Sequence, residues 1–139
     1  MVKILESDEL PFIHVPRITT RVLCGNGTGA TGTTIWEQWI EPDGFIPMHY
    51  HDTEEVLVIL DGSVVLELID SQVEVTAPAS ILVGEKELHG LHPVEDSRVH
   101  LFGVFPTSNP RIWDHQGNPR PLPTDDVTTV NNPFPSDHK

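Results

Sequence analysis

The sequence is poor in basic residues, in cysteine and in long apolar runs, and each shortage excludes a class of protein. Only 8 lysines and arginines stand against 21 acidic residues, so the formal net charge is −13. A field of this sign repels polyanions and anionic membrane surfaces, which argues against nucleic-acid and membrane binding. No segment approaches the roughly 18 consecutive apolar residues of a membrane span.

Cysteine occurs once, as Cys24, which cannot form an internal disulfide. A chain without disulfides suits a reducing compartment. The N-terminus also lacks a cationic, apolar leader. We therefore expect a soluble, cytoplasmic protein whose partner is a small molecule.

Apolar residues at helical spacing are also missing, while 13 prolines and 10 glycines separate short aliphatic runs. This composition favours a mostly β domain of short strands. We interpret residues 1–105 as one β domain, whose N-terminal part, broken by Pro11 and Pro16, forms edge strands or extended segments. Seven of the prolines fall in residues 106–139, so this proline-rich tail is expected to be irregular and only partly packed.

Alternating apolar residues and turn signals predict about eight strands, with turns every eight to twelve residues or so, as in an antiparallel sandwich or barrel. In the strand predicted at residues 33–40, Trp36, Gln38 and Ile40 share the face that is the better candidate for the inner one. Asp61 and Gly62 predict a two-residue hairpin. The other strands of this series are predicted at 56–60, 63–69, 72–77, 80–84, 89–92 and 98–105.

Two histidines and a glutamate stand directly ahead of the strand at 56–60, in the stretch MHYHDTEEVLVILDG. His49 and His51 are two residues apart, so in an extended chain they project together and can bind one metal ion. Chance predicts about 0.45 His-x-His pairs here, but requiring Glu55 and Gly62 at their spacings lowers this to roughly 3 in 1000. A divalent cation would compensate the charge of a glutamate at the head of a buried strand.

His89 is the candidate for a third nitrogen ligand, because it follows a turn and begins a strand that can run beside the first. His92 lies three residues further on and faces the opposite side of an extended strand. Gln38 and His100 are the candidate pocket groups that orient a substrate. His100 shares a face with Phe102 and Val104, and it is either a pocket residue or a hydrogen-bonded core histidine.

These residues resemble the first motif of the cupin superfamily, and specifically its small single-domain members. That motif has a glycine, then HxH, a glutamate three or four residues later and a glycine after six more; here it reads DGFIPMHYHDTEEVLVILDG. The second motif is weaker: ILVGEKELHGLHP keeps His89 but has Gly84, Lys86 and Pro93 where proline, glycine and asparagine are usual. The resemblance covers roughly residues 33–105.

The resemblance implies an all-β chain folded as an antiparallel jelly-roll β-barrel, also called a double-stranded β-helix. It also implies one divalent metal ion held by His49, His51, Glu55 and His89, and commonly a dimer. We expect a homodimer in which pairing between subunits covers the exposed N-terminal strand edges. The tail is expected to lie on the outer sheet or on the partner, or to form a lid from Trp113, Asp114 and His115.

A site with three imidazoles and one carboxylate suits Fe(II), Mn(II), Ni(II) or Zn(II). Our first hypothesis is an enzyme, a mononuclear Fe(II) dioxygenase that cleaves a small enol, diketone or hydroxyketone. The alternative is a non-redox lyase, isomerase or cyclase that uses the metal as a Lewis acid. Two further hypotheses are a non-catalytic module that binds a metal or small acid, and a pH-sensitive histidine cluster without metal.

Overall fold

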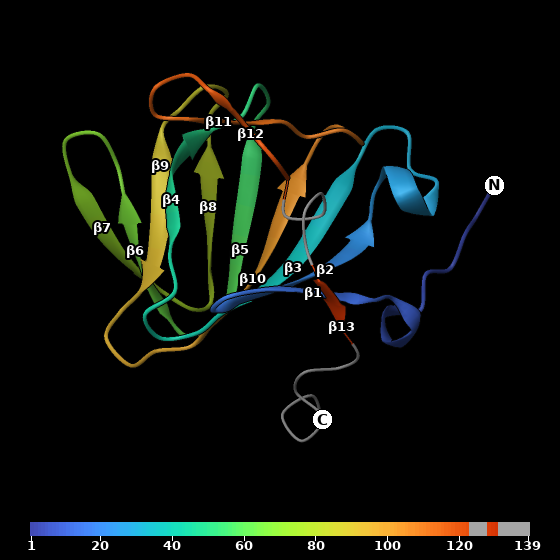
Figure 1. Cartoon of the computed structure of the whole chain (residues 1–139), viewed down its shortest axis with the longest axis horizontal. Helices are drawn as coiled ribbons and strands as arrows, with labels where there is room; N and C mark the ends of the chain where they lie inside the picture. The colour runs from blue at the N-terminus through green and yellow to red at the C-terminus, as the bar shows by residue number, and fades with distance from the viewer. Residues whose placement is uncertain (123–127, 131–139) are drawn as a thin grey trace.

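The computed structural model describes residues 1–122 and 128–130, and these are built almost wholly from strands (Figure 1). The residues predicted to be tail at 123–127 and 131–139 lie outside the described part. No helix within that part is long and apolar enough to cross a membrane. The described elements are η1 (Ser7–Glu9), β1 (Phe12–Val15), β2 (Ile18–Cys24), η2 (Asn26–Thr28), β3 (Thr34–Ile40), β4 (Ile46–Tyr50), β5 (Glu55–Asp61), β6 (Ser63–Glu67), β7 (Gln72–Thr76), β8 (Ala79–Val83), β9 (His89–Pro93), β10 (Val99–Phe105), β11 (Ile112–Asp114), β12 (Pro119–Arg120) and β13 (Thr128–Val130).

The strands form two antiparallel sheets, which confirms the predicted all-β jelly-roll class. One sheet has the order β13-β1-β2-β3-β10-β5-β8 and the other β12-β11-β4-β9-β6-β7. In Figure 1, β4, β6, β7 and β9 lie toward the left, β2 and β3 toward the right, and β11 and β12 cross the upper end. Of the N-terminal strands expected at an edge, β2 lies inside its sheet, and β13 pairs with the outer side of β1.

The chain passes from one sheet to the other at residues 61–63. Asp61 ends β5 and lies opposite His100 of β10, whereas Ser63 begins β6, which pairs with β7 and β9. The prediction of a hairpin at this point is therefore wrong, because β5 and β6 belong to different sheets. Gly62 has φ +88°, and a Cβ there would lie 2.3 Å from the carbonyl oxygen of Arg98, so the corner requires glycine.

The core lies between the sheets and is made from alternate residues of the central strands. In β5, Leu57 and Ile59 are buried, and the same alternation turns Glu55 inward. Burial of each large aliphatic side chain stabilises the fold by roughly 1.5–3 kcal/mol. The core cluster contains Ile40, Leu57, Ile59, Val64, Leu66, Val83, Leu91, Val99 and Leu101.

The outer face of the seven-stranded sheet carries a buried ion pair. Arg21 donates from Nε and Nη2 to Oε1 of Glu37, at 3.0 and 2.6 Å, and His100 Nε2 lies 2.7 Å from the other carboxylate oxygen. Arg21 and Glu37 are each only 7% exposed. Trp39 stacks on the ring of His100 at 4.7 Å, and the Arg21 guanidinium lies over Phe12. The network ties β2, β3 and β10 together.

The variant Glu37→Gln should destabilise the protein in a pH-dependent way. Burial alone would raise the pKa of Glu37, but hydrogen bonds from His100 and Arg21 outweigh it and lower the pKa below its ordinary 4.5. A lowered carboxyl pKa stabilises the fold above about pH 4.5, and this stabilisation is lost as the pH falls through the folded-state pKa. We expect the free energy of unfolding, measured with urea, to fall by about 3 kcal/mol at pH 7. The loss should be smaller at pH 3.5.

The exposed Glu74→Gln variant on β7 serves as the control, since it removes the same charge without breaking a buried pair. It should change the free energy of unfolding by less than about 0.5 kcal/mol at either pH. Equal destabilisation by Glu37→Gln at both pH values would contradict the interpretation.

Candidate metal centre and pocket

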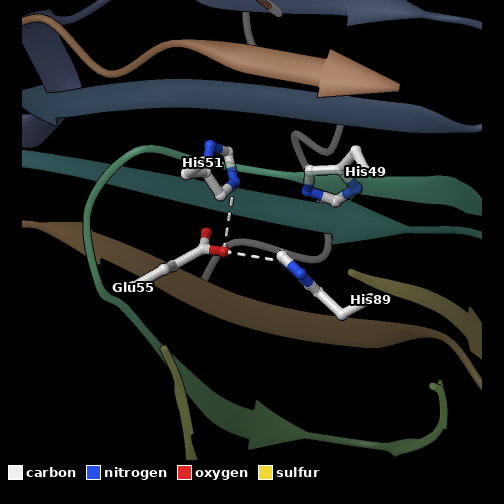
Figure 2. Close-up of side chains that lie close together, drawn as sticks. All are labelled: His49, His51, Glu55 and His89. Atoms are coloured by element: carbon white, nitrogen blue, oxygen red, sulfur yellow. Dashed lines mark hydrogen bonds and ion pairs between the residues drawn. The ribbon is translucent and has the colours of Figure 1, made fainter. Parts of the chain in front are cut away.

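Three histidines and one glutamate converge between the two sheets (Figure 2). His49 lies in β4, His51 follows that strand directly, Glu55 begins β5 and His89 begins β9. One possible ligand atom from each residue can be chosen so that all of them lie within 4.8 Å of one another. The antiparallel register of β4 and β9 places His49 directly opposite His89, so strand pairing completes the cluster that the sequence spacing began.

Each histidine has a backbone carbonyl within hydrogen-bond distance of its Nδ1 atom. A carbonyl oxygen only accepts, so Nδ1 carries the proton and the Nε2 atom of the neutral ring keeps its lone pair. Such outer hydrogen bonds are the usual way in which a metal-binding histidine is oriented. The Nδ1 to oxygen distances are 2.7 Å from His49 to Pro47, 2.8 Å from His51 to Arg111 and 2.8 Å from His89 to Glu87.

Glu55 brings a negative charge to the point that these nitrogen atoms face. Its Oε1 atom lies 3.2 Å from Nε2 of His89 and 3.3 Å from Nε2 of His51 (Figure 2). Nε2 of His51 is buried and has no hydrogen-bond partner in the described part of the chain. A lone pair that faces a carboxylate oxygen is repelled unless a proton or a cation lies between them, so the four residues fit a divalent metal ion.

The protonation states of the four cluster residues depend on their burial and on their effects on one another. Burial and repulsion by His89 lower the pKa of His49 to about 4, so its ring is neutral at pH 7. Burial would raise the pKa of Glu55, but the imidazole rings of His51 and His89 beside its carboxylate outweigh this effect and hold the pKa at about 2. Burial would also lower the pKa of His51, yet Glu55 raises it. The site therefore offers a charged carboxylate and at least one neutral imidazole.

The cluster forms part of the wall of a cavity of about 540 Å³ between the sheets. The size is in the range of ordinary small-molecule sites. Three of the four cluster residues, His51, Glu55 and His89, are buried, and His49 is half-buried. The rest of the wall is mostly apolar and includes Ile13, Val15, Ile18, Trp36, Phe45, Met48, Leu57, Leu91 and Ile112.

Of the two pocket groups expected from the sequence, the structure places one in the pocket. Gln38 lines the cavity, and its Nε2 atom donates to Oγ1 of Thr20 at 3.1 Å, with both residues buried. His100 lies on the opposite face of its sheet, bound to Glu37, and does not line the cavity. The reason is strand alternation, because Leu101 and its alternate neighbours in β10 point to the core and leave His100 outside.

The segment after β10 reaches back to the cluster and forms one wall of the pocket. The carbonyl that accepts from His51 belongs to Arg111, whose Nε donates to Asp52 at 3.1 Å. β11 pairs with β4, and Trp113 stacks on Tyr50 with ring centroids 5.5 Å apart. The start of the predicted tail is thus packed, and it contributes to the site itself.

Sequence reasoning missed several residues of the pocket wall. Thr20 comes from β2, and Asp114, His115 and Arg120 come from the β11 and β12 hairpin. From the sequence, Asp114 and His115 are considered only as parts of a possible lid. No local signal could have placed the hairpin side chains, because β11 reaches the pocket by pairing with β4, which is distant in sequence.

Comparisons with known proteins agree with this fold. A search of curated protein sequences finds no match. Among solved structures, the polyketide cyclase RemF from Streptomyces resistomycificus has a TM-score of 0.69 and 23% identity, over 94% of this chain and 86% of that chain. KdgF from Halomonas sp. has a TM-score of 0.64 and 14% identity, over 77% and 95% of the two chains. Oxalate decarboxylase from Lactobacillus farciminis has a TM-score of 0.69 and 14% identity, over 78% of this chain and 34% of that one.

Likenesses at these identities concern the fold alone, but the family assignment also has direct support from the sequence. The family model described as the cupin domain matches residues 36–105, which is half of the chain. This match includes the whole histidine and glutamate cluster. The chain belongs to the cupin superfamily.

Proposed function

We propose that the protein is a metal-dependent cyclase that closes a ring in a polyketide-like substrate with several carbonyl groups. His49, His51, Glu55 and His89 would bind one divalent metal ion. The observation that carries the proposal is the combination of this cluster with a mostly apolar cavity of about 540 Å³. Such a cavity is much larger than a small diketone requires, and it suits an apolar body of several fused rings.

The similarity to the polyketide cyclase RemF supports the same substrate class, since it extends over 94% of this chain. A bound metal ion would act as a Lewis acid that polarises a carbonyl group and stabilises an enolate. The apolar walls would exclude water from the reacting carbons. In an aldol condensation a new carbon–carbon bond forms and one water molecule leaves, so no oxidant is needed.

Gln38 would orient the substrate. Its Nε2 atom is held by Thr20, which leaves the amide oxygen to accept a hydrogen bond from an enol or phenol hydroxyl group. Because Gln38 is buried at the cavity wall, its position is set by the fold before substrate binds.

The Fe(II) dioxygenase expected from the sequence is the second candidate. Its support is the donor set, since three nitrogen atoms and one oxygen atom leave up to two positions of an octahedral ion for substrate and dioxygen. Lyase and isomerase chemistry would use the same Lewis acid. A non-catalytic binding role predicts ligand-dependent stabilisation and no product.

Two further expectations remain proposals. The cytoplasmic location is still supported by the single cysteine. We also propose that the chain forms a homodimer through β7 or β8, which each have a neighbour on only one side among the described strands. These strands expose Val73 and Leu82, at 46% and 66%.

Metal content tests the centre directly. Protein purified without chelator or nickel resin should contain close to one divalent ion per chain, by elemental analysis. His51→Ala and His89→Ala should each lower the metal affinity by more than about 100-fold, because even the loss of an outer hydrogen bond costs 10- to 100-fold. The control is His92→Ala, since His92 lies on the same strand but faces Glu67 at 3.4 Å. Retention of the ion by both cluster variants would exclude the proposed centre.

Turnover tests the chemistry. An aromatic poly-β-ketone should give a product lighter by one water, detected by mass spectrometry, without dioxygen uptake. Gln38→Ala should lower kcat/KM about tenfold by removing one substrate hydrogen bond. The exposed Gln72→Ala variant on β7 should leave it unchanged. Dioxygen uptake with a small diketone and iron in the site would instead favour the dioxygenase.

Light scattering after size exclusion tests the dimer. The expected mass is about twice the 15.5 kDa of one chain. Leu82→Glu and Val73→Glu place charge on β8 and on β7, and at least one of these variants should shift the protein toward the monomer. A wild-type protein that is monomeric at 100 µM or so would contradict the proposal, since a stable dimer has a far lower Kd.

A further inference from the structure

The β11 and β12 hairpin gives the pocket an exposed polar side. Three polar side chains of this hairpin, Asp114, His115 and Arg120, line the same cavity as the buried cluster. His115 and Arg120 are exposed, whereas His51, Glu55 and His89 are buried. The cavity wall therefore combines the buried cluster, apolar side chains and polar side chains in contact with water.

The acidic member of the three, Asp114, is occupied by its own turn. Its Oδ1 atom accepts hydrogen bonds from the backbone N–H groups of Gln116 and Asn118, both at 2.9 Å. The hydrogen bond from Asn118 is the largest effect on the pKa of Asp114 and lowers it; desolvation opposes this, and the hydrogen bond from Gln116 lowers the pKa further. The backbone N–H of Gly117 also bonds the Asp114 carbonyl oxygen. This carboxylate shapes the turn and is not held by Arg120.

Among the described residues that line the cavity, Arg120 is the only lysine or arginine. In the described residues it makes no hydrogen bond or ion pair. Three other arginines each bind a carboxylate, namely Arg21 with Glu37, Arg98 with Glu41 and Arg111 with Asp52. In a chain with 21 acidic residues and 8 basic ones, an arginine that keeps its donors free beside an apolar pocket is available for an acidic ligand.

We propose that Arg120 binds the carboxylate of the pocket's ligand, so that the ligand is an amphipathic organic acid. Its apolar body would lie between the sheets, and its oxygen atoms for the metal would face the buried cluster. This inference deepens the proposed function, on which it rests for the metal end of the molecule. His115 of the same hairpin also lines the cavity.

The sheet topology places Arg120 two strands away from the strand that carries His49. β12 is separated from β4 by β11, and neighbouring strands lie about 4.8 Å apart, so the Arg120 backbone lies about 10 Å from the strand that carries His49. The guanidinium fork binds a carboxylate through two parallel hydrogen bonds, which a ligand without the acid cannot form.

Binding of two matched probes to metal-free protein tests the inference. 1-Pyrenebutyrate and 1-pyrenebutanol share an apolar body and differ in the terminal group, and Trp36 in the cavity wall reports their binding by energy transfer. The wild type should bind the acid about tenfold more tightly than the alcohol. Arg120→Gln should remove this preference with the alcohol affinity unchanged, and Arg120→Lys should keep part of it.

Lys3→Gln is the matched control, because Lys3 is exposed and does not line the cavity, and the variant removes the same charge. It should retain the full preference for the acid. The proposal is overturned if the wild type binds both probes equally or neither, if Arg120→Gln weakens both alike, or if Lys3→Gln reproduces the loss. The probes are tested on metal-free protein, so a negative binding result does not bear on the proposed metal centre. Likewise, the absence of metal from the purified wild type would not change the result of the binding experiment.

Discussion

The buried negative charge of Glu55 is the constraint on which the arrangement of the site depends. Strand alternation turns this carboxylate toward the core together with Leu57 and Ile59, and an uncompensated charge at that depth costs several kcal/mol. His51 and His89 lie against it from two other parts of the chain. A bound cation would compensate the same charge more completely, which is the physical link between the fold and the proposed metal centre.

The histidine rings of the cluster donate hydrogen bonds to backbone carbonyls, so the orientation of each ring depends on the chain segment that carries its acceptor. The acceptor for His51 is the carbonyl of Arg111, in the segment that continues into β11 and β12. The same segment supplies Arg120 and other groups on the exposed side of the pocket. The orientation of a candidate metal ligand and the shape of the ligand cavity are therefore set by one stretch of chain, anchored by Trp113 on Tyr50.

Local patterns predicted those features that depend on a single strand. The alternation in residues 33–40 correctly placed Gln38 on the inner face, and the spacing of His49 and His51 correctly placed both in one cluster. The same patterns did not predict which strands pair with each other. Asp61 and Gly62 have the composition of a hairpin turn, but the chain changes sheet there, because β5 pairs with β8 and β10 while β6 pairs with β7 and β9.

The sequence by itself determined the all-β class, the cupin motif and the types of the four cluster residues, because these depend on side-chain chemistry and on a period of two along one strand. The tertiary structure alone decided that His100 lies outside the pocket while Thr20 and Arg120 lie within it. Those placements depend on the register between strands, including the pairs Trp39–His100 and Tyr50–Trp113, whose residues lie more than sixty positions apart; no local preference of the chain encodes such a register.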